Sequence, residues 1–148
     1  MPIYKQGDMW NVLDEVDHFI ITTNAIVKQN GALVMGAGIA KQARDRYPGL
    51  DEMFGSHIKL FHPKGVYGLQ LWLDSKFGMF QVKQHYKDTA NIQLIIYSTG
   101  MLAQAAQTCP KVKFALNFPG IGNGKLTYDE VKPIVDLLPD NVQVWTFT

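Results

Sequence analysis

The sequence predicts an α/β fold with three layers, in which a mixed, mostly parallel central sheet is flanked by helices. Short segments rich in β-branched and aromatic residues recur along the 148 residues. Several of them, such as residues 19–21 (Phe-Ile-Ile), are continuous apolar runs, which are typical of strands buried on both faces. Segments with helical periodicity separate these runs, and this alternation favours a mostly parallel sheet covered by helices.

The expected strands share a high content of Val, Ile, Phe, Tyr and Trp and are bounded by turn-forming residues. They cover residues 3–5, 18–22, 67–73, 79–83, 113–118 and 142–147.

The expected helices lie between these strands. They cover residues 39–47, 91 to about 107, and 127–137. The second has apolar or small residues at roughly helical spacing, namely Ile92, Ile95, Ile96, Thr99, Leu102 and Ala106. Pro48-Gly49 ends the first helix and Pro139 follows the third.

Residues 49–76 are the hardest segment to assign. Glycines, Pro63 and two histidines interrupt any long period, so we expect mostly loop with one or two short edge strands. Because no repeat or linker interrupts the chain, residues 1–148 are expected to form a single domain.

Composition limits the kinds of partner. The charged share is 18% and the formal net charge is +1, so a bound anion must be held by local geometry rather than by the overall field. A helix with Lys41, Arg44 and Arg46 also carries Asp45, and this is no strong sign of non-specific nucleic-acid binding. Apolar stretches are too short to span a bilayer, so we expect a cytoplasmic protein without membrane association, and a monomer.

No cofactor or metal is expected. Cys109 is the only cysteine, which excludes an internal disulfide, and we interpret it as a small buried or half-buried side chain. The spacing of Cys109 with His57, His62 and His85 matches no pattern that closes a tetrahedral zinc site.

A glycine-rich loop, residues 24–38, follows the second expected strand and ends in Met35-Gly36-Ala37-Gly38-Ile39 at the start of a helix. Backbone N–H groups and the positive end of the helix dipole at such a position bind anions, and glycines let a diphosphate approach closely. The same residues are also compatible with a simple tight turn. A Rossmann site is disfavoured because a strand with a ribose-binding acid does not follow the helix.

A second glycine loop, residues 118–124 (Phe-Pro-Gly-Ile-Gly-Asn-Gly), repeats the arrangement between a strand and a helix. Two such units in one small domain are less expected by chance than one. Together they predict a diphosphate held from both sides by backbone donors.

These residues resemble the macrodomain family, and most closely its branch with terminal ADP-ribose protein glycohydrolase and the DNA-ADP-ribose-removing antitoxins. The resemblance runs from Gly7 to about Val131 and rests on matches of several residues each. They are Gly7-Asp8-Met9-Trp10, Thr22-Thr23-Asn24, Met35-Gly36-Ala37-Gly38-Ile39-Ala40, Arg46-Tyr47-Pro48, Phe80-Gln81-Val82-Lys83 and Pro119-Gly120-Ile121-Gly122-Asn123-Gly124.

The resemblance implies ADP-ribose or an ADP-ribosylated substrate as the partner. It implies that Asp8 accepts a hydrogen bond from the adenine amino group and that Asn24 meets the distal ribose. The implied ligand-binding set is Asp8, Met9, Thr23, Asn24, Met35, Gly36, Ala37, Gly38, Ile39, Pro119, Gly120, Ile121, Gly122, Asn123 and Gly124. Structural roles for Asp8, as a turn cap, and for Asn24, in its loop, are the alternatives.

Lys83 and Asn24 are the implied catalytic residues of an ADP-ribosyl hydrolase. Lys83 would act as a nucleophile if neutral or as an orienting cation if charged, and an ordinary solvated lysine is the alternative. The carboxylates that relatives carry near this site correspond to Gly124 and Thr127 here. The missing carboxylates favour a non-catalytic reader of ADP-ribose-like nucleotides as one alternative, and an ADP-ribose 1''-phosphate phosphatase, which uses the same pocket, is another.

Two further segments are considered at the distal-ribose end. Lys28-Gln29-Asn30-Gly31 lengthens the first glycine loop relative to those relatives and is a candidate either for shaping the distal pocket or for contacting the group attached to the distal ribose. His85-Tyr86-Lys87 is either a stacking site beside the ribose or an exposed strand end. Asp129 and Glu130 are expected to complement the dipole of the last helix, and supplying a carboxylate to the site is the alternative.

Overall fold

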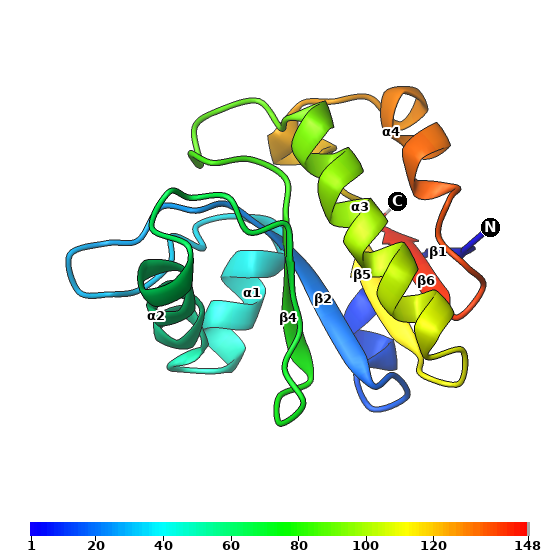
Figure 1. The fold of residues 1–148 in the computed structure, drawn as a ribbon, viewed down its shortest axis with the longest axis horizontal. Helices are drawn as coiled ribbons and strands as arrows, with labels where there is room; N and C mark the ends of the chain where they lie inside the picture. Colours follow the sequence, from blue (N-terminus) through cyan, green and yellow to red (C-terminus); the bar gives the residue numbers. More distant parts are fainter. Residues whose placement is uncertain (148) are drawn as a thin grey trace.

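The computed structural model describes residues 1–147 and confirms the three-layer α/β/α fold (Figure 1). Within that range the strands form one sheet in the order β1-β6-β5-β2-β4-β3. All neighbouring strands are parallel except β3, which is antiparallel to β4, so the sheet is mixed and mostly parallel. The strands are β1 (Ile3–Gln6), β2 (His18–Thr23), β3 (Leu69–Gln70), β4 (Phe77–Gln81), β5 (Phe114–Asn117) and β6 (Val142–Thr146).

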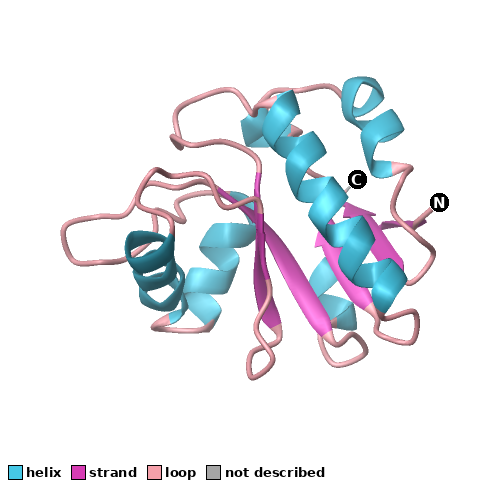
Figure 2. Ribbon diagram, viewed as in Figure 1, coloured by secondary structure: helices cyan, strands magenta, loops and turns pink. Residues whose placement is uncertain are grey.

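Helices cover both faces of the sheet, as Figure 2 shows. The α-helices are α1 (Gly38–Arg46), α2 (Leu50–Phe61), α3 (Ile92–Thr108) and α4 (Tyr128–Val135), and two short 3-10 helices are η1 (Met9–Val12) and η2 (Gly122–Gly124). Three of the α-helices lie where the sequence predicted them.

The expectation of a loop over most of residues 49–76 is wrong, because α2 occupies its first half. Leu50, Phe54 and Ile58 are buried at intervals of four residues, which places them on one face of a helix. Gly49 precedes the helix in a left-handed conformation (φ 96°), and Gly55 interrupts the pattern at sequence level. Only the edge strand β3 remains of the strand predicted over 67–73.

Alternating side chains of the strands build two separate cores. Ile20, Phe80 and Leu116 pack with α3 and α4 on one face of the sheet. Phe19, Ile21 and Met79 pack with α1, α2 and η1 on the other face. Because strand side chains alternate between faces, every central strand contributes to both cores, as the continuous apolar runs predicted.

Local hydrogen bonds fix the ends of the helices. The Asn91 side chain accepts from the N–H groups of Gln93 and Leu94 and caps α3. Thr127 and Glu130 form a capping box at the start of α4, so Glu130 supports this helix end as expected. Cys109 follows α3 and is exposed, which corrects its predicted burial: the helix ends there, beyond the last packed turn.

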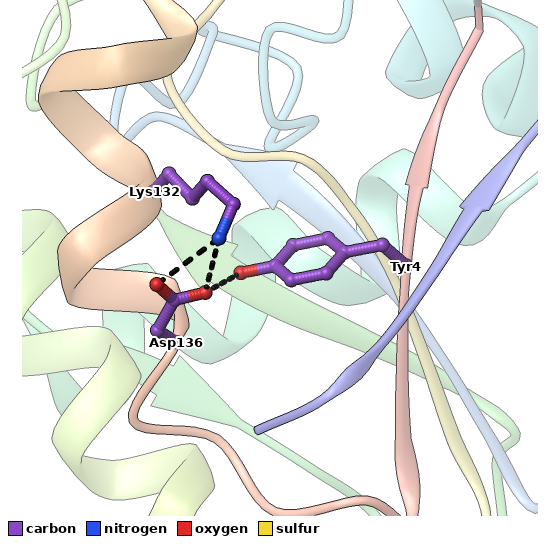
Figure 3. Close-up of polar contacts among 3 residues, drawn as sticks. All are labelled: Tyr4, Lys132 and Asp136. Atoms are coloured by element: carbon purple, nitrogen blue, oxygen red, sulfur yellow. Dashed lines mark hydrogen bonds and ion pairs between the residues drawn. The ribbon is translucent and has the colours of Figure 1, made fainter.

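A polar cluster ties the edge strand β1 to α4 (Figure 3). The Tyr4 hydroxyl donates a hydrogen bond to Oδ1 of Asp136. The Lys132 ammonium lies 3.0 Å from the same oxygen and 4.9 Å from the centroid of the Tyr4 ring. Strand β1 is therefore held at the edge of the sheet by side-chain contacts with α4 as well as by its pairing with β6.

Among the described residues, no helix combines the length and the apolar character needed to cross a membrane.

Candidate ligand-binding cleft

A cleft of about 1170 Å³ opens at the carboxyl ends of the parallel strands. Its walls come from the segments that follow β1, β2, β4, β5 and β6, at the upper end of the sheet in Figure 1. Ligands of α/β proteins bind at this edge, outside the carboxyl ends of the strands. The cleft exceeds the usual range for drug-sized ligands, which is roughly 300–1,000 Å³, so it has room for a dinucleotide.

Nearly all residues expected to bind the ligand line this one cleft. They are Asp8, Met9, Thr23, Asn24, Met35, Gly36, Ala37, Gly38, Ile39, Gly120, Ile121, Gly122, Asn123 and Gly124, and Lys83 lines it as well. Pro119 does not line it: this residue is buried and directly precedes Gly120, whose φ is positive (83°).

The first glycine loop (24–38) leads to the N-terminus of α1. Ala37 is the N-cap residue, and within residues 1–147 no side chain caps this end. The first N–H groups of a helix have no partner inside the helix, so those of α1 are available to an anion. A Cβ placed on Gly36 would have no atom of the described chain within 4 Å, which leaves the backbone open to the cleft.

The second glycine loop (118–124) faces the first across the cleft. Gly122 has φ 67° and begins η2. A Cβ placed on Gly38 would lie 4.0 Å from Nδ2 of Asn123, so the two loops meet there. The tertiary structure thus brings together two segments that are about 80 residues apart in the chain.

Asn24 is buried in the cleft wall, and its amide holds the first glycine loop. Its Nδ2 donates to the carbonyl of Val34 and its Oδ1 accepts from the N–H of Ile26, both at 2.9 Å. Its backbone carbonyl accepts from the hydroxyl of Tyr67 at 2.7 Å. A carboxamide has two N–H donors and two lone pairs, so one of each remains for a ligand.

Lys83 lies just beyond β4, which ends at Gln81 rather than at residue 83 as predicted. The residue is only 9% exposed. Its Nζ is 3.0 Å from the carbonyl oxygen of Asp88, 3.3 Å from that of Tyr86 and 3.5 Å from that of Asn123. Burial lowers the pKa of Lys83, although the Asp88 carboxylate opposes this shift and Lys125 adds to it.

The opposite end of the cleft is formed by Asp8 and aromatic residues. Oδ1 of Asp8 accepts from the N–H of Trp10 at 3.0 Å and caps η1, which leaves the second carboxylate oxygen for a ligand. The guanidinium of Arg46 lies 4.3 Å from the centroid of the Trp10 ring. Trp145 at the end of β6 also lines this end, although sequence reasoning did not select it. The signal in the sequence that could have identified Trp145 is the pair of aromatic residues at the end of the last expected strand.

The charges along the cleft favour an anionic ligand. Arg46, Lys83, Lys87 and Lys125 line it, whereas Asp8 is the one acidic residue among its described lining residues. Because the net charge of the chain is only +1, this is a local concentration of cations.

Two segments considered for the distal end behave differently. Tyr86 and Lys87 line the cleft, and the Tyr86 ring stacks on His85 with centroids 4.4 Å apart. Residues 28–31, in contrast, are not among the described lining residues, so shaping of the pocket by them is not supported, and contact with a group attached to the ligand stays a prediction. Gly31 lies against Gly55 of α2, whereas Lys28, Gln29 and Asn30 are exposed.

A six-stranded α/β/α domain with two glycine loops across one cleft is the architecture of macrodomains, and solved structures confirm this fold. The Mycobacterium tuberculosis DarG macrodomain superposes with a TM-score of 0.77 at 21% identity, over 100% of this chain and 99% of that one. The Thermus aquaticus DarG macrodomain gives 0.72 at 22% identity, over 100% and 98%.

A third structure, described as Thermosipho africanus DarTG in complex with ADP-ribose, gives a TM-score of 0.74 at 21% identity. It is matched over 97% of this chain and 41% of that one. No protein-family model and no curated protein matches the sequence. Because the solved macrodomain structures superpose over nearly all of this chain, it has the macrodomain fold.

Proposed function

We propose that this protein binds ADP-ribose or a derivative of it in the cleft at the strand ends. The observation that carries this proposal is the meeting of two glycine loops, one of them at an uncapped helix N-terminus, across a single cationic cleft. Such loops hold a diphosphate through backbone N–H groups. The similar fold of Thermosipho africanus DarTG in complex with ADP-ribose supports this choice of diphosphate.

The ligand would lie with its adenine at Asp8 and its distal ribose at Asn24. The free oxygen of Asp8 would accept from the adenine amino group, and the remaining donor and acceptor of Asn24 would meet ribose hydroxyls. The expected ligand-binding residues would act in this arrangement, except Pro119, which is buried and does not line the cleft.

The enzymatic form of the proposal is hydrolysis of the bond between the anomeric carbon of the distal ribose and an attached group. The oxygen of water forms the new bond to this carbon, and the leaving group takes up a proton. Lys83 and Asn24 are assigned to this end of the cleft, and binding of the rest of the ligand would position the reacting carbon.

A non-catalytic reader is the second candidate, because two positions that carry acids in relatives cannot supply one here. Gly124 has no side chain, and the Thr127 hydroxyl is engaged in the capping box of α4.

Release of phosphate from ADP-ribose 1''-phosphate, without turnover of ADP-ribosylated protein or DNA, would favour the phosphatase alternative.

Calorimetric titration with ADP-ribose tests the binding proposal. Gly36→Glu places a carboxylate into open space at the cleft, and φ of Gly36 is not positive, so the variant should fold. We expect saturable one-to-one binding by the unmodified protein and at least a tenfold loss in Gly36→Glu. Gly36→Gln separates charge from volume, and Gly100→Glu on the exposed face of α3 is the matched control. No binding at millimolar ADP-ribose would refute the proposal.

A further inference from the structure

The ammonium of Lys83 joins two loops that form the end of the cleft assigned to the distal ribose. Two of its acceptors, the carbonyls of Tyr86 and Asp88, belong to the β4–α3 loop (residues 82–91). The third, the carbonyl of Asn123, belongs to the second glycine loop. The side chain therefore bridges segments that are 40 residues apart in the sequence.

The same two loops share one other hydrogen bond among the described residues, and it lies closer to α3. The N–H of Ala90 donates to the carbonyl of Gly124 at 2.8 Å. A Cβ placed on Gly124 would lie 3.0 Å from Cβ of Ala90, so the backbones are packed closely there. For the part of the loop that carries Tyr86 and Lys87 into the cleft, the described hydrogen bonds that reach the second glycine loop run through Lys83. From the first glycine loop, the N–H of Ala25 donates to the carbonyl of Gln84 at 2.8 Å.

The acceptors around Nζ bear on the chemical state of Lys83. An ammonium group has three N–H donors and no lone pair, and three carbonyl oxygens surround this one. A nucleophilic lysine must instead be neutral and must direct its lone pair at the reacting carbon. In the observed position three carbonyl oxygens lie 3.0–3.5 Å from Nζ and favour the charged form, whereas burial of the ammonium lowers its pKa and opposes them.

We propose that Lys83 is a positioning residue, whose ammonium fixes the β4–α3 loop against the second glycine loop and does not act as a nucleophile. The loop tie itself is independent of the ligand, whereas its consequence for hydrolysis rests on the proposed function. If the protein is a hydrolase, water attacks the anomeric carbon without a lysine-bound intermediate.

Hydrogen exchange of the free protein tests the tie. The N–H of Asp88 donates to the carbonyl of His85, and that of Lys87 to Nδ1 of His85, so both amides report on the order of this loop. We expect Lys83→Met to speed exchange of these two amides at least tenfold while that of Ala90 changes less. Lys83→Arg, which retains a charged donor, should restore much of the protection.

Lys111→Met is the control, because it removes an exposed lysine that lies outside the cleft. Unchanged exchange at residues 87 and 88 in a folded Lys83→Met variant would overturn the proposal. This measurement needs no ligand, so its outcome stands even if ADP-ribose does not bind.

A chemical trap tests the excluded nucleophile. A neutral lysine would condense with the open-chain aldehyde of ADP-ribose, losing water, and cyanoborohydride would reduce the imine to a stable amine. We expect no such adduct at Lys83 by peptide mass spectrometry, together with about a tenfold weaker ADP-ribose affinity in Lys83→Met. A stoichiometric adduct at Lys83 would contradict the proposal, whereas absence of ADP-ribose binding would refute the proposed function instead.

Discussion

Gly55 of α2 lies against the backbone of Gly31, so closely that a Cβ on Gly55 would be 2.1 Å from the Gly31 carbonyl oxygen. The same Cβ would be 2.8 Å from the N–H nitrogen of Leu33. In addition, the N–H of Leu33 donates to the carbonyl of Asp51 at 2.9 Å. Helix α2 thus supports the first glycine loop by direct backbone contact, without lining the cleft itself.

Gly55→Ala should destabilise the protein. The clashing atoms are backbone atoms that cannot rotate away, so overpacking is expected to cost about 1–3 kcal/mol of unfolding free energy. The shift of the loop should also weaken ADP-ribose binding. Urea denaturation and calorimetry measure the two effects.

Gly100→Ala is the matched control for this substitution. Gly100 lies within α3 with no atom within 4 Å of its Cβ position, so alanine should stabilise the helix by roughly 0.5–1 kcal/mol. Equal effects of the two substitutions would show that α2 does not constrain the loop.

Asp8→Asn should separate the capping role of Asp8 from its proposed role at the adenine. Asparagine keeps an oxygen that accepts from the Trp10 N–H, so unfolding free energy should change little. We expect several-fold weaker ADP-ribose binding, because the carboxylate charge is lost. Asp8→Ala should in addition cost about 1 kcal/mol of stability through the lost cap. Full affinity of Asp8→Asn would restrict Asp8 to capping.

Tyr4→Phe should lower the unfolding free energy by about 1 kcal/mol, since it removes one hydrogen bond between β1 and α4. The hydrogen bond from Tyr4 has the largest lowering effect on the pKa of Asp136, and the Lys132 ammonium has the second largest. Because the pKa of Asp136 is lower in the folded state, the carboxylate stabilises the protein at pH values above its unfolded pKa of about 3.9. This contribution is lost as the pH falls from there through the folded pKa. Because Asp136 is about 30% exposed, solvent screening keeps it small.

Chemical denaturation at pH 7 and pH 3 measures this effect. The decrease in unfolding free energy between pH 7 and pH 3 should be smaller in Tyr4→Phe than in the unmodified protein. Tyr97→Phe is the control, because Tyr97 is exposed on α3. An equal loss in both variants would rule out a specific contribution of the cluster in Figure 3.

His18 should make the protein less stable in mild acid. Burial lowers its pKa, against the opposing effect of Asp17. Its Nδ1 is buried without a hydrogen-bond partner among the described residues. The unfolded chain therefore binds a proton more readily, and stability should fall as the pH drops below about 6.5.

His18→Phe keeps an aromatic ring against Phe114, whose ring centroid lies 5.3 Å from that of His18. We expect a smaller loss of unfolding free energy between pH 7.5 and 5.5 in this variant, measured by urea denaturation. An unchanged pH dependence would assign the effect to other groups.

Local sequence patterns determined most of the layers and the two glycine loops. Continuous apolar runs place strands in the centre of a sheet, and alternation with helical segments sets the order of elements, because both follow from burial of neighbouring residues. The sequence patterns did not predict helix α2, because Gly55 and the left-handed Gly49 lower the local preference for a helix. The packing of Gly55 against the first glycine loop compensates for this in the folded protein.

The tertiary structure alone decided what the site residues touch. Sequence could select Asn24 and Lys83 as polar residues after buried strands, but their partners lie in other segments. Val34 holds the Asn24 amide, and the carbonyl of Asn123, 40 residues away, accepts from the Lys83 ammonium. Hydrogen bonds between distant segments depend on how the chain folds back, and residue type and spacing carry no record of that geometry.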